Sequence, residues 1–197
     1  MSQIVIMWKK FKQHNYFSHF KKQPLKIEFQ PFVFSVAGQT VQIMRAKPDD
    51  ISNMLLLETQ AYNGRMPWNA EVFQSELAKS NLLYLVVYQS STLVAYAGVR
   101  INQLEAHITN ITVAPNWQGQ GLGTQLMQIM IELVQEWGCE CVSLEVRVDN
   151  LIAQKLYRQL GFSPTFIRPN YYQETQTDGL NMVLDLTQTR NKKGIKF

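Results

Sequence analysis

The chain has 197 residues, 46% of them hydrophobic and 17% charged, a composition that supports one packed domain with an extension and excludes a wholly disordered chain. No apolar run approaches the ~18 residues of a membrane-spanning helix, and the apolar stretch at residues 4–8 lacks the preceding basic residues of a secretory signal. The formal net charge of +4 favours an anionic partner.

The positive charge lies at the two ends of the chain. Residues 1–40 hold six lysines against the single acid Glu28, and residues 187–197 hold four basic side chains and no acid. Residues 41–186 carry nine basic and fourteen acidic side chains, so they are acidic overall. We therefore expect a basic N-terminal extension at 1–40, a folded domain at 41–186 and a basic C-terminal tail at 187–197.

The extension mixes its lysines with aromatic residues, namely Trp8, Phe11, Tyr16, Phe17 and Phe20. Such a mixture can bind single-stranded nucleic acid or a membrane surface, although terminal segments are more often flexible tails, and we favour the tail. Met7 is an alternative start of the protein.

The first predicted strand covers residues 41–45, where apolar and polar side chains alternate. A helix is predicted to begin at Pro48, with acids in its first turn and apolar residues at helical spacing, which are Ile51, Met54, Leu55 and Ala61. Pro67 and Trp68 then interrupt the chain, and Asn69 can cap a second helix that ends near Lys79.

Three β-rich segments follow, at residues 82–88, 92–103 and 106–114. A glycine-rich turn leads into a long amphipathic helix that Gly138 ends, and a strand at 141–146, a helix at 150–160 and two final strands complete the chain. The order β-α-α-β-β-β-α-β-α-β-β predicts an α+β fold with helices on a mixed sheet.

Two cysteines, Cys139 and Cys141, lie one residue apart. They are too close for easy disulfide geometry and too few for a metal site, so we expect no metal and a reducing cytoplasm.

The turn at 118–123 reads Gln-Gly-Gln-Gly-Leu-Gly and stands at the start of a helix. Glycines let a ligand approach the backbone closely, and the free N–H groups of a helix start favour a phosphate. The turn departs from the dinucleotide fingerprint, because Thr124 stands where the third glycine would be, and from the P-loop, because no Gly-Lys-Ser/Thr follows. We therefore predict pyrophosphate binding, with a tight strand-to-helix connection as the alternative.

Two residues that follow this helix in the sequence are candidates for a chemical role. Glu145 lies in an otherwise apolar strand, where a carboxylate costs free energy unless it is paired or useful, although such a residue most often faces solvent. Tyr157 lies on an amphipathic helix, where packing is the common role of a tyrosine.

Residues 110–184 resemble the GNAT superfamily of N-acetyltransferases, whose signature Gln/Arg-x-x-Gly-x-Gly/Ala is met by Gln118, Gly121 and Gly123. Within it they are most similar to the RimI-type enzymes, which acetylate the N-terminal alanine of a small-subunit ribosomal protein. The similarity continues in Asn-Ile-Thr-Val at 110–113, Leu-Glu-Val-Arg at 144–147, Leu-Gly-Phe at 160–162 and Arg-x-Asn-Tyr-Tyr at 168–172. It is weaker over residues 41–79 and does not extend to residues 1–40.

The resemblance implies the GNAT fold, with a mixed central sheet flanked by helices, and acetyl-CoA as acetyl donor. It implies that Glu145 is the proton acceptor and Tyr157 the proton donor. The residues that would bind acetyl-CoA are Ile111, Thr112, Val113, Gln118, Gly119, Gln120, Gly121, Leu122, Gly123, Thr124 and Asn150. Candidate walls around the acceptor are Trp68, Tyr171 and Tyr172, with packing against the sheet as the alternative.

An α-amino group has a pKa of ~7.7–8.0, so it must lose a proton before it attacks a thioester, and Glu145 suits that task. We therefore expect direct transfer to the N-terminus of a basic ribosomal protein, with RNA contact through the basic ends. The alternatives are a GNAT enzyme for a small amine or an internal lysine, and a silent acyl-CoA-binding module on ribosomes. Glu58, Glu71 and Glu76 could attract a basic peptide, although we expect each on a solvated helix face.

Overall fold

The computed structural model describes residues 27–62, 64 and 68–187, which form two compact units. The larger unit comprises residues 27–144 and 184–187, and the smaller comprises residues 145–183. No helix of the described part is long and apolar enough to cross a membrane. The predicted contacts of residues 1–26 and 188–197 with RNA lie outside the described residues.

The larger unit is built on strands β1 (Phe32–Val36), β2 (Gln39–Arg45), β3 (Leu82–Gln89), β4 (Thr92–Asn102) and β5 (Glu105–Val113). Each pairs with the next in antiparallel fashion, and β6 (Cys141–Arg147) then pairs in parallel with β5 from Glu105↔Cys141 to Ile108↔Leu144. The sheet is therefore mixed, as the sequence predicts. β1 was not predicted, and it pairs with β2 across the expected boundary at residue 40.

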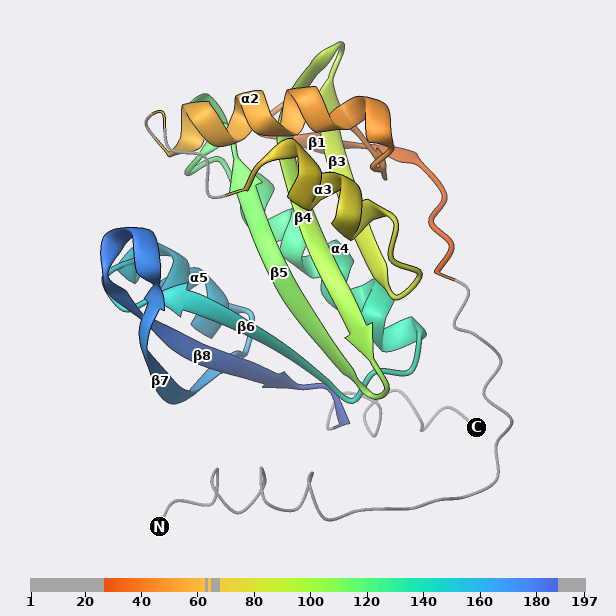
Figure 1. The fold of residues 1–197 in the computed structure, drawn as a ribbon. Helices are drawn as coiled ribbons and strands as arrows, with labels where there is room; N and C mark the ends of the chain where they lie inside the picture. The colour runs from red at the N-terminus through yellow and green to blue at the C-terminus, as the bar shows by residue number, and fades with distance from the viewer. Residues whose placement is uncertain (1–26, 63, 65–67, 188–197) are drawn as a thin grey trace, which may run out of the picture. The chain divides into compact units, whose positions relative to one another are not determined.

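Helices cover both faces of this sheet (Figure 1). A 3-10 turn at Pro48–Asp50 leads into α2 (Ile51–Ala61), and α3 (Ala70–Leu77) follows, with both helices in front of the sheet in this view. The Asn69 side chain accepts a hydrogen bond from the Val72 N–H at 2.9 Å, which confirms the predicted cap. Helix α4 (Leu122–Glu136) runs behind the sheet.

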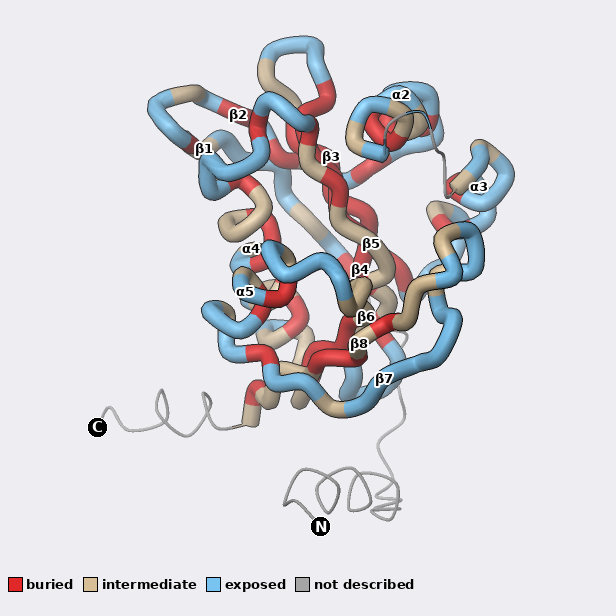
Figure 2. The backbone as a smooth tube through the Cα atoms, turned by 90° about the vertical axis from the view of Figure 1, so that its left-hand side faces the viewer, coloured by how far each residue is buried: buried red, intermediate tan, exposed pale blue. Residues whose placement is uncertain are grey.

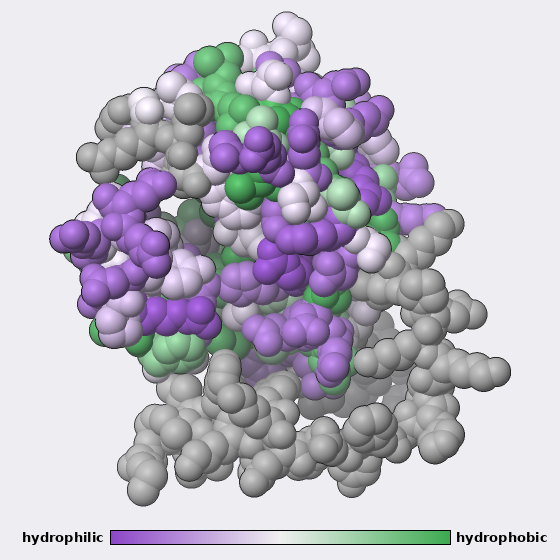
Figure 3. Space-filling model, viewed as in Figure 1, coloured by the Kyte–Doolittle hydropathy of each residue, from purple (hydrophilic) through white to green (hydrophobic). Residues whose placement is uncertain are grey.

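The core of the larger unit lies along β3 and β4, where buried residues run almost without interruption (Figure 2). Phe73 of α3 is fully buried, and its ring meets those of Tyr84 and Tyr96 edge-on at centroid distances of 6.1 and 5.8 Å. The outer surface of α3 is mostly hydrophilic (Figure 3), with Val72 as an exposed apolar residue, so this short helix buries one face and exposes the other.

A β-bulge divides β5 into two parts. Val99 pairs with Ile108 and Gly98 pairs with Asn110, so Thr109 is an extra residue without a counterpart on β4. Because the bulge reverses the alternation of side chains, Asn110 lies on the opposite face of the sheet from Ile108. An added Cβ at Gly98 would lie 2.5 Å from Thr109 Oγ1, so glycine is required opposite the bulge.

The smaller unit contains the end of β6, helix α5 (Leu151–Gln159) and the antiparallel strands β7 (Ser163–Tyr172) and β8 (Thr177–Asp185). The last two residues of β8 belong to the larger unit. A 3-10 turn at Gln173–Thr175 joins the strands. Gly161, with φ of 94°, ends α5, and the Phe162 N–H donates to the Tyr157 carbonyl at 2.9 Å. These elements match the predicted order.

We expect Gly98→Ala to lower the free energy of unfolding by about 1–3 kcal/mol, because the new methyl group must displace Thr109 or the Tyr84 ring. Urea unfolding followed by circular dichroism measures the loss. Gly123→Ala is the matched control, since its Cβ would meet only Val113 Cγ2, at an ordinary 3.6 Å. A Gly98→Ala protein as stable as the control would contradict the steric argument.

Candidate active site

The end of β5 presents two chemically different faces. Thr112 pairs with Tyr96 and shares its face, where α2 and α3 lie, whereas Val113 is on the other face, beside Gly123 of α4. Within the larger unit, β6 ends at Leu144, which pairs with Ile108 of β5. No β6 residue of this unit therefore lies opposite Ile111 or Val113. The backbone predicted to meet the acetyl group therefore belongs to a strand end whose two faces meet different helices.

The glycine turn leaves open space for a ligand. Gly119 and Gly121 have φ of 72° and 90°, and a Cβ added at either would meet nothing within 4 Å. Leu122, also predicted as a cofactor residue, is buried and anchors the first turn of α4. The N–H groups of the turn and of the helix start can therefore surround a phosphate without a side chain between them.

Two glutamine side chains stabilise this turn through hydrogen bonds to the backbone. The Gln118 side chain donates to the Val113 carbonyl at 3.0 Å, and the Gln120 side chain donates to the Asn116 carbonyl at 2.6 Å. Both glutamines were predicted to bind acetyl-CoA. In the structure their amides connect the turn to the chain that precedes it, which fixes the positions of the backbone donors.

Glu145 lies at the centre of a polar cluster in the smaller unit. Its carboxylate meets the Arg168 guanidinium at 3.3 Å and accepts hydrogen bonds from Asn181 at 3.1 Å and from the Tyr171 hydroxyl at 3.5 Å. The Glu145 side chain is only 4% exposed. The common alternative of a solvent-facing glutamate is therefore wrong, since this carboxylate is buried and has donors at both oxygens.

The predicted aromatic walls Tyr171 and Tyr172 join the same cluster. Their rings meet edge-on at 5.1 Å, and the Tyr172 hydroxyl donates to the Glu145 backbone carbonyl at 3.2 Å. The Arg168 guanidinium lies 5.6 Å from the Tyr171 ring centroid. The Tyr171 side chain lies close to Gly179, where an added Cβ would come within 3.0 Å of the Tyr171 Cβ and 3.1 Å of its ring.

Two predicted residues belong to α5. The Asn150 side chain accepts a hydrogen bond from the Ala153 N–H at 3.1 Å and so caps the helix. Tyr157 is buried at 7% exposure, and its ring lies 5.8 Å from that of Phe162. Glu145 and Tyr157 thus belong to one unit, while the glycine turn, Thr124 and Trp68 belong to the other.

Trp68 lies against the aromatic core of the larger unit, with its ring 5.4 Å from that of Phe73. It is half-buried, so the structure supports its alternative role in packing and leaves part of its surface accessible. Its contact with an acceptor remains a prediction.

The expectation of solvated helix faces is wrong for two of the three early glutamates. Glu58 of α2 is 2% exposed, and Glu76 of α3 is 7% exposed and paired with Arg100 and Lys79. Glu71 is exposed, as expected. The sequence held a signal for Glu58, because it follows Met54 by four residues and precedes Ala61 by three, on the apolar stripe of the helix.

Glu58 organises a second polar cluster, which the sequence analysis missed. Its Oε1 accepts hydrogen bonds from the hydroxyls of Tyr96 and Thr112, the latter at 3.1 Å. Burial, and then the negative charge of Glu58, raise the pKa of Tyr96 well above its usual value. The same two causes raise the pKa of Tyr62.

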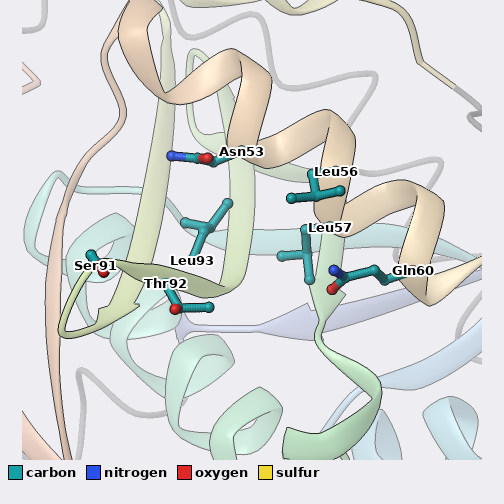
Figure 4. Close-up of a pocket in the computed structure, with 7 residues that line it drawn as sticks. All are labelled: Asn53, Leu56, Leu57, Gln60, Ser91, Thr92 and Leu93. Carbon is teal, nitrogen blue, oxygen red and sulfur yellow. The ribbon is translucent and has the colours of Figure 1, made fainter.

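A small pocket of about 160 Å³ lies between α2 and the turn that joins β3 to β4 (Figure 4). None of its residues was predicted to be functional. The lining side chains are all uncharged and comprise Asn53, Leu56, Leu57, Gln60, Ser91, Thr92 and Leu93. It offers no acid or base to a reaction.

Within residues 27–187, apart from the gaps in the description, no three His, Cys, Asp or Glu side chains gather as a metal site would require. Burial, followed by the charge of Glu105, raises the pKa of the Cys141 thiol to about 12, so this thiol stays protonated at neutral pH.

Comparison with known proteins agrees with these features. Residues 49–162, more than half of the chain, match the family model described as the acetyltransferase (GNAT) family. The N-alpha-acetyltransferase RimI of Mycobacterium tuberculosis (strain H37Rv) is 35% identical over 133 residues, which cover 66% of this chain and 82% of that protein.

Two solved structures have the same fold. The crystal structure of the ribosomal-protein-S18-alanine N-acetyltransferase from Escherichia coli superimposes with a TM-score of 0.68 at 30% identity, covering 74% of this chain and 94% of that one. The PaiA N-acetyltransferase of Thermoplasma acidophilum, solved in complex with coenzyme A, has a TM-score of 0.61 at 14% identity and covers 74% and 98%. The chain belongs to the GNAT family of N-acetyltransferases, which use acetyl-CoA.

Proposed function

We propose that this enzyme transfers an acetyl group from acetyl-CoA to the N-terminal α-amino group of a ribosomal protein that begins with alanine. The observation that carries the proposal is the buried carboxylate of Glu145, held by Arg168 and Asn181 in a strand whose sequence resembles the RimI-type enzymes. The names of the relatives in Mycobacterium tuberculosis and Escherichia coli support N-terminal acetylation.

The chain provides a suitable cradle for the donor. Open space beside Gly119 and Gly121, together with the N–H groups at the start of α4, fits a pyrophosphate. We assign the acetyl arm to the backbone of residues 111–113 and the pantetheine to Asn150, whose side-chain oxygen also caps α5. Acetyl-CoA supplies an activated thioester when it is bound.

Glu145 serves as the base in this proposal. Its carboxylate takes a proton from the acceptor ammonium, directly or through water, so that the neutral nitrogen can bond to the acetyl carbon. The backbone N–H near Val113 stabilises the charge on the carbonyl oxygen, and Tyr157 protonates the sulfur as the carbon–sulfur bond breaks. Cys141 takes no part, because its protonated thiol is a poor nucleophile.

The proposal is tested with purified protein, acetyl-CoA and a basic peptide that begins with alanine and contains one internal lysine. We expect release of CoA and acetylation of the α-nitrogen alone, located by fragmentation mass spectrometry. Acetylation of the lysine, or activity only on a small amine, would favour the rival enzyme class. Absence of CoA release with every acceptor would favour a silent binding module. The cytoplasmic location and RNA contact through the basic ends stay predictions.

Glu145→Gln is expected to lower the transfer rate by about 10²–10⁴-fold, because the amide keeps the shape but cannot accept the proton. Acetyl-CoA affinity, measured by calorimetry, should change less than about twofold, since the cradle lies elsewhere in the sequence. The matched control is Glu174→Gln, an exposed glutamate of the same unit. Wild-type turnover in Glu145→Gln would exclude the base assignment.

Tyr157→Phe is expected to slow the chemical step by about 10-fold or more, because the leaving sulfur loses its proton donor. A single-turnover experiment with enzyme in excess isolates that step from product release. Loss of the hydroxyl leaves the contact of the ring with Phe162 in place. A single-turnover rate equal to that of the wild type would remove Tyr157 from the mechanism.

A further inference from the structure

The two oxygens of the buried Glu145 carboxylate have different neighbours. Oε1 accepts a hydrogen bond from the Asn181 side-chain amide at 3.1 Å and lies 3.3 Å from the Arg168 Nε. Oε2 lies 3.5 Å from the hydroxyl of Tyr171, a residue that is 42% exposed. A proton on Oε1 would face an N–H donor and a cation, so a proton that this carboxylate takes up belongs on Oε2.

A second hydrogen bond fixes the orientation of the Asn181 amide. The Thr165 hydroxyl donates to the Asn181 Oδ1 at 2.5 Å and also lies 3.1 Å from the Asn181 backbone carbonyl oxygen. Because an ionised carboxylate only accepts hydrogen bonds, Asn181 directs its NH2 group to Glu145 and its Oδ1 to the hydroxyl. Thr165, Asn181 and Glu145 therefore form a chain of hydrogen bonds with one direction.

Strands β7 and β8 lie side by side (Figure 1), and a β-bulge in β7 brings the threonine to this amide. The register of the pair shifts between Pro164 and Ile167. Thr165 and Phe166 therefore lie opposite a single residue of β8, which is Asn181. A bulge redirects side chains, and here it places a hydroxyl beside the amide that contacts the candidate base. Asn181 is only 4% exposed, so little water competes for this amide.

We propose that Asn181 and Thr165 are positioning residues, which hold Glu145 so that its Oε2 takes the proton from the acceptor ammonium. Asn181 acts through its hydrogen bond to Oε1, and Thr165 acts through Asn181. The O–H bond forms at Oε2 while an N–H bond of the ammonium breaks and leaves its electron pair on the nitrogen. The inference rests on the proposed function, because it specifies how the base of that function is oriented.

The test measures the single-turnover transfer rate and the affinity for acetyl-CoA, with the basic peptide that begins with alanine as acceptor. Asn181→Leu removes the donor but keeps a side chain of similar size, and we expect the rate to fall about tenfold. Thr165→Val removes only the hydroxyl, and we expect a smaller fall of about threefold, because this residue acts through the amide. Acetyl-CoA affinity should change less than about twofold, since the orientation of the base affects the chemical step.

Two comparisons separate positioning from general damage to the fold. Thr165→Ser keeps the hydroxyl and should restore the rate that Thr165→Val loses. Thr177→Val is the matched control, because Thr177 belongs to the same unit and its hydroxyl donates only to a backbone carbonyl, that of Thr175, at 3.1 Å among the described contacts. This control should leave the rate unchanged.

A double-mutant cycle tests whether both residues act through Glu145. In a Glu145→Gln protein no carboxylate remains to be oriented, so Asn181→Leu and Thr165→Val should each lower the residual rate less than about twofold. An equal fractional loss in both backgrounds, as general damage would give, would overturn the inference. If Asn181→Leu fails to fold, Thr165→Val and Thr165→Ser carry the test.

Wild-type rates in both Asn181→Leu and Thr165→Val would also overturn the inference. The wild type is assayed first with the same peptide, which keeps the two proposals apart. If it acetylates the α-nitrogen and the variants match its rate, the inference alone fails. A wild type without activity on this peptide rejects the proposed function.

Discussion

The extra residue at Thr109 is the constraint on which the candidate site depends. Without it, Ile108, Asn110 and Thr112 would share one face of β5. The bulge moves Asn110 and Thr112 to the face of α2 and α3, where their side chains reach the Tyr96 hydroxyl and Glu58. Gly98 makes the bulge possible, because no other residue leaves room for both Thr109 and the Tyr84 ring.

The bulge also explains how a polar cluster can lie inside a sheet core. Beyond it, apolar Ile111 and Val113 lie on the face that α4 covers, so the polar side chains of Asn110 and Thr112 lie together on the other face. There the polar groups satisfy one another: the Thr109 hydroxyl lies 3.3 Å from that of Tyr84, and Asn110 donates to Tyr96 at 3.4 Å. A buried carboxylate at Glu58 is tolerable only within such a set of donors.

Much of this fold can be predicted from the sequence, because most elements carry local signals. Asn69 and Asn150 cap helices, Gly138 and Gly161 end them, and apolar and polar residues alternate at 41–45. β1 was not predicted, because its residues belong to a segment whose basic and aromatic residues are typical of a flexible tail. The bulge is visible in the sequence, because two adjacent polar residues, Thr109 and Asn110, interrupt the alternation of polar and apolar residues in this strand. The contact of Arg168 with Glu145 joins residues 23 positions apart, and no local pattern predicts it.

The two buried carboxylates illustrate why residue type alone does not predict a role. Glu145 is held by a guanidinium and an amide, so a cation offsets the cost of burying its charge. Hydroxyl groups hold Glu58, and because they are neutral, its charge still acts on Tyr62 and Tyr96 and raises the pKa of both. The same residue type therefore lies beside a cation in one place and among hydroxyl groups in the other.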